Sequence, residues 1–188
     1  MASSFAEPRW RSQRQWRRGS VPEALIHWLL DTSSLTLRLR QACAGCFRVS
    51  VVSQSWQRPA LSERRALGMG DAEFALVRQV RLLCDEQPWV FARTVIPVST
   101  LGGARRRLIC LGSKPLGAAL FADRSMRRGE VEIAAFEHGQ PTFERAVETL
   151  DQRPVTVWGR RSVFCLNTKP LMVSELFLPG IERCGLAL

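Results

Sequence analysis

Two apolar runs flanking a turn are the feature that most constrains the fold of this sequence. In EFALVRQVRLLCDEQPWVFARTVIP, residues 73–97, both runs are rich in β-branched and aromatic residues, and Asp85–Pro88 separates them. This pattern predicts a β-hairpin. Side chains alternate between the two faces of a strand, so Arg78 shares a face with Leu76 and Val80. The hairpin therefore places an arginine on an otherwise apolar face.

A second charge interrupts an apolar run near the C-terminus. In TKPLMVSELFLP, residues 168–179, Glu175 lies between Val173 and Leu176. An unpaired buried charge costs several kcal/mol, so Glu175 and Arg78 each need a partner. The two charges pair with each other, or their faces are solvated, or both line a cavity for a small anion. In such a cavity the arginine would hold a carboxylate and the glutamate would serve as acid, base or hydroxyl acceptor.

The remaining patterns predict one α+β domain, in keeping with a length of 188 residues. Apolar residues at helical spacing predict short helices: two within residues 22–41, one at 115–121 and one at 142–150. Alternating or β-branched runs predict further strands at residues 47–54, 130–135, 155–158, 162–166 and 171–178. Consecutive hairpins imply an antiparallel sheet, and the helices make the class α+β.

The net charge of +10 raises the question of nucleic-acid binding. Basic residues gather in two places, with five arginines in residues 1–20 and three at Arg105–Arg107. No nucleic-acid-binding motif accompanies them, so we expect no nucleic-acid partner. We expect residues 1–20 to form a basic, loosely ordered tail and residues 21–188 to form the single domain.

The N-terminus lacks the apolar core of a secretory signal, although its arginines and serines also resemble an organellar transit peptide. No run approaches the roughly 18 consecutive apolar residues of a membrane span. We therefore expect a cytoplasmic protein with no integral membrane segment.

Six cysteines should remain reduced in that compartment. Cys84 and Cys165 lie in apolar runs, where a thiol behaves as a small hydrophobic group. The CAGC sequence at Cys43–Cys46 has the spacing of half a zinc site or of a redox motif. Because no second such pair accompanies it, an ordinary loop is the favoured interpretation, and we expect no metal.

Three separated blocks resemble a known enzyme family. They are VRQVRLLCDEQPWVFARTVIPVST (77–100), LGSKPLGAALF (111–121) and WGRRSVFCLNTKPLMVSELFLP (158–179), in the order found in bacterial chorismate pyruvate-lyases. The resemblance spans about residues 22–179. It implies conversion of chorismate to 4-hydroxybenzoate and pyruvate at the entry to ubiquinone synthesis. It also implies a six-stranded antiparallel sheet flanked by helices, with the ligand enclosed between the sheet and helical flaps.

The resemblance implies roles for individual residues. Arg78 would bind the ring carboxylate, Glu175 would contact the hydroxyl, and the backbone at Leu116 would help to close the site. Leu35 stands where the family commonly has a ligand-contacting methionine, so apolar contact is kept while the shape differs. The reaction yields an aromatic ring, which supplies its driving force, so we expect no metal or redox cofactor.

Arg160 and Arg161 in WGRRS are two candidates for the enolpyruvyl carboxylate. Adjacent residues of a strand face opposite ways, so at most one of them should point where Glu175 points. A solvated basic turn is the alternative interpretation. The segment 122–157 is longer than the resemblance implies, and we expect it to alter only the periphery.

A sensor remains the second interpretation of the fold. Ligand-sensing domains of some bacterial transcription regulators resemble it and would keep the pocket without the reaction. Such sensors normally follow a helix-turn-helix domain, for which residues 1–20 leave no room, so the enzyme is favoured. We expect a monomer whose partners are chorismate and 4-hydroxybenzoate.

Overall fold

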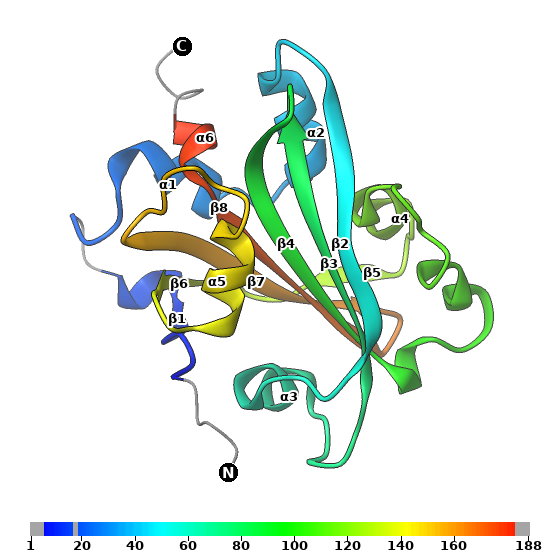
Figure 1. Ribbon diagram of the computed structural model, residues 1–188. Coiled ribbons are helices and arrows are strands. Elements are labelled where there is room, and N and C mark those ends of the chain that lie inside the picture. The colour runs from blue at the N-terminus through cyan, green and yellow to red at the C-terminus, as the bar shows by residue number, and fades with distance from the viewer. Residues whose placement is uncertain (1–5, 17–18, 183–188) are drawn as a thin grey trace.

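The computed structural model describes residues 6–16 and 19–182 and shows one twisted antiparallel sheet with helices on both faces (Figure 1). The strands are ordered β1-β6-β7-β8-β4-β3-β2, and β5 also pairs with β7. The strands are β1 (Arg11–Ser12), β2 (Phe47–Gln57), β3 (Ala75–Cys84), β4 (Gln87–Pro97), β5 (Met126–Arg128), β6 (Glu132–Glu137), β7 (Thr156–Leu166) and β8 (Lys169–Phe177). The α-helices are α1 (Glu23–Leu29), α2 (Leu35–Ala42), α3 (Leu61–Leu67), α4 (Leu116–Phe121), α5 (Pro141–Val147) and α6 (Pro179–Glu182). Three short 3-10 helices are η1 (Gln13–Gln15), η2 (Val98–Thr100) and η3 (Gly103–Leu108).

The α+β class and the antiparallel sheet are confirmed, but the sheet has eight strands where six were expected. The six longer strands, β2, β3, β4, β6, β7 and β8, form its body. The two additional strands are short: β1 has two residues and pairs with β6, and β5 has three residues and pairs with β7. Strands of two or three residues are too short to show an alternating pattern, so they cannot be predicted from periodicity.

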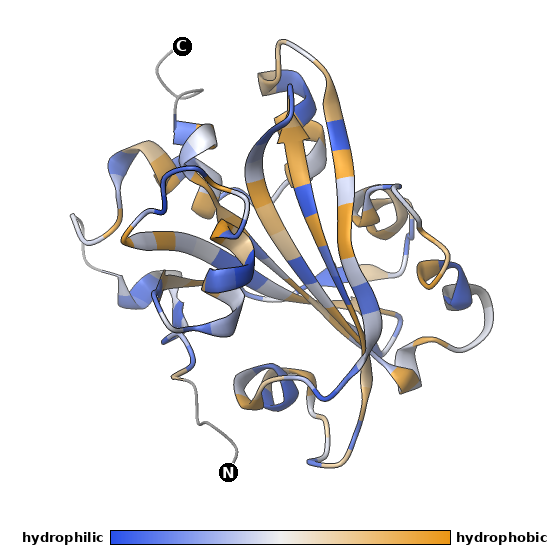
Figure 2. Ribbon diagram, in the orientation of Figure 1, coloured by the Kyte–Doolittle hydropathy of each residue, from blue (hydrophilic) through white to orange (hydrophobic). Residues whose placement is uncertain are grey.

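The hairpin expected over residues 73–97 is confirmed. β3 and β4 pair from Ala75 opposite Pro97 to Cys84 opposite Gln87. The two turn residues between them have φ values of 47° and 66°, the left-handed geometry that suits the twist of a two-residue hairpin. In Figure 2, hydrophilic positions interrupt an otherwise hydrophobic β3. Because side chains alternate between the two faces of a strand, Arg78 lies on the same face as Leu76 and Val80.

One long strand, β7, replaces the two strands expected at 155–158 and 162–166. Gly159 lies within β7 at a position with no space for a side chain. A Cβ there would be 2.9 Å from the ring of Phe136 and 3.0 Å from the backbone oxygen of Glu175. The glycine thus permits close approach of neighbouring side chains and backbone. The WGRRS motif therefore lies inside a strand rather than in a turn before one.

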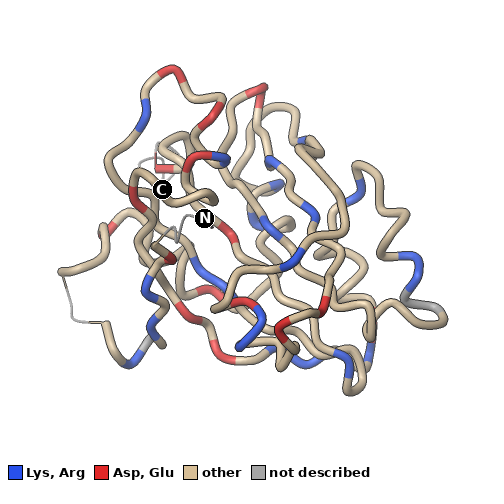
Figure 3. Tube along the Cα trace, turned by 60° about the horizontal axis from the view of Figure 1, so that its bottom comes forward, with Lys and Arg blue, Asp and Glu red and all other residues tan. Residues whose placement is uncertain are grey.

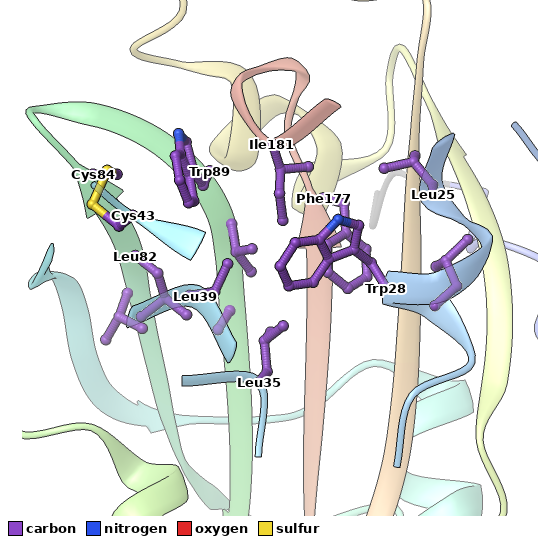
Figure 4. Packing of buried hydrophobic residues seen from close by; sticks show 14 of the residues in the cluster. Leu25, Trp28, Leu35, Leu39, Cys43, Leu82, Cys84, Trp89, Phe177 and Ile181 are labelled. Carbon is purple, nitrogen blue, oxygen red and sulfur yellow. A yellow bond between two sulfur atoms is a disulfide. The ribbon is translucent and has the colours of Figure 1, made fainter. Parts of the chain in front are cut away.

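Apolar side chains cover both faces of the sheet. On one face, α1 and α2 pack against β3, β4 and β8, and α4 packs against the opposite ends of β7 and β8. On the other face, α3 and α5 pack against β4 and β8. Figure 4 shows Trp28 of α1 beside Phe177 of β8, with ring centroids 6.5 Å apart, and Leu35 of α2 close by. The first face, with its helical layer, encloses the candidate site.

Part of the N-terminal segment packs against the sheet, contrary to the loosely ordered tail that we expected. β1 pairs with β6, the ring of Trp10 lies 5.4 Å from that of Phe136, and the ring of Trp16 lies 5.0 Å from that of Trp158. Burial of large aromatic rings offsets the entropy lost when such a segment becomes ordered. The other residues that we assigned to the tail include some outside the described part of the chain.

A disulfide joins Cys43 to Cys84, contrary to the expectation that all cysteines remain reduced (Figure 4). Their Cα atoms are 5.8 Å apart although 41 positions separate them in sequence. Cys43 directly follows α2 and Cys84 ends β3, so tertiary packing brings them together. The CAGC motif therefore has one cysteine in a disulfide and one, Cys46, exposed and free. The other free cysteines are Cys110 and Cys165, and Cys184 lies outside the described residues.

Basic and acidic positions are scattered over the trace in Figure 3. Several arginines have carboxylate partners, including Arg93 with Glu63 at 2.7 Å and Arg38 with Asp31 at 2.7 Å. Within residues 6–16 and 19–182, no helix combines the length and apolar character needed to cross a membrane.

Candidate active site

A small cavity lies between the sheet and the helices of its first face. Its volume is about 60 Å³, several times the roughly 10–15 Å³ that one buried water needs. Strands β2, β3, β4, β5, β7 and β8 contribute to its lining, as do α2, α4 and the segments before these two helices. The charged residues of the lining are Arg78, Arg128, Arg160 and Glu175.

Arg78 lies on β3 at the floor of the cavity, and only 3% of its surface is exposed. Its Nη2 donates to the backbone oxygen of Gly112 at 2.8 Å and to that of Lys114 at 3.4 Å, and its Nη1 makes a long contact of 3.4 Å with Gln54. These acceptors are neutral. Burial lowers the pKa of Arg78, but an arginine remains charged at neutral pH. The guanidinium is therefore a buried cation without a carboxylate partner among the described residues.

Glu175 lies on β8 directly opposite Arg160 of β7. Arg160 Nε donates to Glu175 Oε2 at 2.6 Å, so this bond leaves the other carboxylate oxygen, Oε1, unoccupied. The Glu175 side chain is 17% exposed, whereas that of Arg160 is only 1% exposed. The two charges of the sequence analysis, Arg78 and Glu175, thus lie in one cavity but do not pair with each other. Glu175 is paired instead with the neighbouring strand.

Arg160 also connects the sheet to the end of α1, which covers the cavity. Its Nη1 donates to the backbone oxygen of Trp28 at 2.7 Å and to that of Asp31. Both carbonyls belong to the end of α1 and the turn that follows it. Arg160 therefore positions Glu175 through Nε and anchors the chain that covers the cavity through Nη1.

Two helices close the cavity from the side opposite the sheet. Leu35 begins α2, Leu116 begins α4, and both line the cavity. A Cβ at Gly117 would lie 3.4 Å from the Thr36 hydroxyl oxygen, so the two helices meet closely there. The structure thus places Leu35 and Leu116 where the sequence analysis expected a closing, largely apolar surface.

Arg161 does not belong to the cavity, although we expected it among the substrate-binding candidates. It points to the other face of the sheet, where its Nε donates to Glu132 at 2.7 Å and its Nη1 to Ser62 at 3.3 Å. Its guanidinium also lies 4.4 Å from the ring centroid of Trp10. Strand alternation explains the difference, since Arg160 and Arg161 are adjacent residues of β7.

Arg128 is a cavity residue that the sequence analysis missed. It ends β5, lies opposite Phe164 of β7, and donates from Nε to the Ser162 hydroxyl oxygen at 3.1 Å. Its Nη1 donates to the backbone oxygen of Thr32 at 2.8 Å. Burial, followed by repulsion from Arg160, lowers its pKa. The only sequence signal was MRRGE in a charged region, and a three-residue strand is too short to reveal which arginine faces inward.

The lining of the cavity has a positive excess. Three arginines face one carboxylate, and that carboxylate is paired with Arg160. Among the described residues, neither Arg78 nor Arg128 forms an ion pair with an acidic side chain. Arg78 is buried and Arg128 is half-buried. Cations in such surroundings favour anionic ligands, because an anion supplies the missing counter-charge. The cavity thus suits a small ligand with carboxylate groups.

A larger groove of about 990 Å³ lies on the other face of the sheet. Its charged residues include Arg93 and Glu63, which form a buried pair with distances of 2.7 and 3.0 Å. Of the four arginines in its lining, Arg64, Arg93 and Arg145 have carboxylate partners, so most of the positive charge there is already compensated and volume alone does not make this groove the better candidate. In the described part of the chain, no group of three or more His, Cys, Asp or Glu residues is placed to hold a metal ion.

Residues 8–183 match the chorismate lyase family. The chain is 41% identical over 161 residues to the probable chorismate pyruvate-lyase of Psychromonas ingrahamii, with 84% of each chain covered. It is 42% identical over 156 residues to the probable chorismate pyruvate-lyase of Methylococcus capsulatus, covering 82% of this chain and 94% of the relative.

A solved structure shares the fold at low sequence identity. The ligand-binding domain of a putative GntR-family transcriptional regulator from Bordetella bronchiseptica aligns with a TM-score of 0.52 and 15% identity, covering 72% of this chain and 86% of that one. This likeness shows the fold alone.

Proposed function

Because the chain belongs to the chorismate lyase family, we propose that it converts chorismate to 4-hydroxybenzoate and pyruvate. The observation that carries this proposal is the presence of Arg78 and Glu175 in one closed cavity, each without the other as partner. They lie on β3 and β8, with β4 between them, so their Cα atoms are on the order of 10 Å apart across the strands. In this proposal the ring lies between their side chains, with its carboxylate toward Arg78 and its hydroxyl toward Glu175.

The reaction is an elimination that makes an aromatic ring. The bond between the ring carbon and the enolpyruvyl ether oxygen breaks, and the carbon that bears the hydroxyl loses its hydrogen as a proton. The released enolpyruvate takes up a proton and becomes pyruvate. Atoms and electrons balance without an external oxidant or reductant. Aromatisation provides the driving force, so the proposed reaction requires neither a metal nor a cofactor.

Arg78 binds the ring carboxylate in this proposal. Its planar guanidinium offers two parallel donors, which match the geometry of a carboxylate better than a lysine ammonium does. The ligand supplies the counter-charge that Gly112 and Lys114 backbone oxygens do not. Leu35 and the backbone at Leu116 cover the ring and exclude water.

Glu175 accepts a hydrogen bond from the ring hydroxyl through Oε1, while Arg160 holds Oε2. This arrangement fixes the carboxylate beside the carbon that loses its proton. A carboxylate in that position orients the substrate and assists the proton transfer. The proposed product, 4-hydroxybenzoate, enters ubiquinone synthesis, and we place this first step in the cytoplasm.

The test is to mix the purified protein with chorismate and a metal chelator and to measure 4-hydroxybenzoate and pyruvate separately. Equal amounts of both products are expected. Glu175→Gln keeps the side-chain shape but removes its charge, and it should lower kcat strongly. Glu132→Gln is the matched control, because Glu132 pairs with Arg161 at 2.7 Å on the other face of the sheet. Equal turnover of the Glu175→Gln and Glu132→Gln proteins would contradict the role of Glu175.

A binding-only function is the second candidate, favoured by the shared fold with a ligand-binding domain of a putative transcriptional regulator. Such a protein would use the same cavity without the reaction. The two candidates give different results in one experiment. Absence of both products, together with tight binding of 4-hydroxybenzoate, would support the binding function and refute the lyase.

A further inference from the structure

Arg128 is held in a defined orientation at the edge of the cavity. Its guanidinium lies 5.2 Å from the ring centroid of Phe164, and its bonds to Ser162 and Thr32 fix it from two sides. These bonds use Nε and Nη1. Arg128 therefore presents a fixed cation whose Nη2 is not engaged by the bonds seen among the described residues.

Arg160 cannot readily take the same role. Its Nε is bound to Glu175, and its Nη1 is shared by the backbone oxygens of Trp28 and Asp31. Its Nη2, like that of Arg128, makes no bond among the described residues, so donor count does not separate the two arginines. The difference is charge: Glu175 already neutralises Arg160 at 2.6 Å, whereas Arg128 has no ion pair with a described acidic side chain. Of the three arginines in the cavity, Arg78 and Arg128 are thus the two that remain for ligand anions.

These two arginines approach the cavity from different sides. In the sheet, β7 and the attached β5 lie on one side of β8, whereas β4 and β3 lie on the other. Across the strands, Glu175 on β8 therefore lies between Arg128 and Arg78. The Arg128 guanidinium bonds the backbone oxygen of Thr32, next in sequence to Asp31, whose backbone oxygen accepts from Arg160, the partner of Glu175. The charge of Arg128 therefore lies near the Glu175 end of the cavity.

Chorismate has its charges in a matching order. The ring carboxylate is opposite the hydroxyl, and the enolpyruvyl ether is on the carbon next to the hydroxyl. If Arg78 holds the ring carboxylate and Glu175 the hydroxyl, the enolpyruvyl carboxylate projects from the side of the ring beside the hydroxyl, away from Arg78. Two cations without acidic partners among the described residues thus face a substrate with two carboxylates.

We propose that Arg128 binds the enolpyruvyl carboxylate and makes the site selective for a ligand with two carboxylates over one with a single carboxylate. This inference rests on the proposed function of the same cavity. Before the ether bond breaks, Arg78 and Arg128 hold opposite ends of one molecule. After it breaks, Arg128 holds only pyruvate, while 4-hydroxybenzoate stays with Arg78 and Glu175. Substrate and product therefore depend differently on Arg128.

The experiment compares Arg128→Met with Arg127→Met. Arg127 is the preceding residue of β5, has the same charge and is exposed, and its Nη1 donates to the backbone oxygen of Met126 at 3.1 Å. Steady-state KM is measured with chorismate, and Kd is measured by calorimetry with 4-hydroxybenzoate. Loss of a charge-assisted bond should raise KM about 10- to 100-fold. The Kd of 4-hydroxybenzoate should stay unchanged, and Arg127→Met should change neither quantity.

Arg128→Lys separates charge from geometry. Lysine keeps the charge but loses the planar fork, so its KM should lie between the wild-type value and that of Arg128→Met. An equal loss of affinity for chorismate and for 4-hydroxybenzoate in Arg128→Met would overturn the proposal, because Arg128 would then act on the ring carboxylate or on the fold. An unchanged KM would overturn it as well.

Direct binding keeps this test independent of the lyase proposal. If the wild-type protein makes no product, the lyase proposal fails, and chorismate binding to wild-type and Arg128→Met protein is measured by calorimetry instead. Weaker chorismate binding with unchanged 4-hydroxybenzoate binding would still support the role of Arg128. Equal binding of chorismate to both proteins would refute it.

Discussion

Replacement of Arg160 by methionine should destabilise the protein more than most single substitutions. The side chain is 1% exposed, lies opposite Glu175 in the sheet and forms a 2.6 Å ion pair with it. It also donates to the backbone oxygens of Trp28 and Asp31. Methionine fills similar space without donors, so Arg160→Met leaves a carboxylate and two carbonyls without these partners.

The expected loss follows from this inventory. Removing one member of a buried ion pair costs about 3–5 kcal/mol, because the remaining charge is left uncompensated. Glu175 retains 17% exposure, which lets water recover part of that cost. The carbonyls of Trp28 and Asp31 add to the loss, since an unsatisfied buried acceptor costs about 1–3 kcal/mol. We therefore expect the free energy of unfolding to fall by about 3–5 kcal/mol.

Urea unfolding followed by tryptophan fluorescence measures this loss, and a double-mutant cycle with Glu175→Gln assigns it. In the double variant the carboxylate is neutral, so the combined loss should be smaller than the sum of the single losses by about 0.5–3 kcal/mol. The pair Arg161→Met and Glu132→Gln provides the same cycle on the other face of the sheet. Strict additivity of Arg160→Met and Glu175→Gln would refute the reasoning, because the two side chains would then not stabilise each other.

Two further predictions concern the flap and its edge. Reduction of the Cys43–Cys84 disulfide should lower the free energy of unfolding by about 4 kcal/mol, because the bond closes a long loop. Replacing both cysteines by alanine should have the same effect. Equal urea midpoints with and without reductant would contradict this prediction. Burial raises the pKa of Asp31, but hydrogen bonds from Ser33 and Arg38 outweigh this and lower it from 3.8 to about 2. Asp31 therefore stabilises the fold above its unfolded pKa and loses this effect as pH falls from 3.8 to about 2. Thermal unfolding of Asp31→Asn should show a smaller decrease over that interval, and an identical decrease would refute the assignment.

Local sequence patterns were sufficient to predict the structure wherever a residue's neighbours along the chain determine its environment. The hairpin of residues 73–97 followed from β-prone runs around a turn, and β3 and β4 confirm it. The strand period placed Arg78 and Glu175 on apolar faces, and the structure finds both in one cavity. The two-residue period of a strand also predicted that Arg160 and Arg161 face opposite ways, but it does not determine which of them faces the cavity.

Contacts between distant segments account for the differences. Arg128 reaches the cavity because a three-residue strand pairs with β7, and the disulfide forms because the end of α2 lies beside the end of β3. Trp10 and Trp16 bring the N-terminal segment onto the sheet. None of these contacts has a periodic signature, since each depends on where remote segments meet.

The sequence by itself determined the α+β class, the central hairpin, the family and the two charges that require partners. Periodicity and residue type carry that information, because alternation assigns faces and an apolar run excludes an unpaired charge. Only the tertiary structure decided that Glu175 pairs with Arg160, that Arg161 lies outside the cavity and that Arg128 lies within it. The physical reason is that strand order and register set which side chains share a cavity, and these arise from packing over the whole sheet.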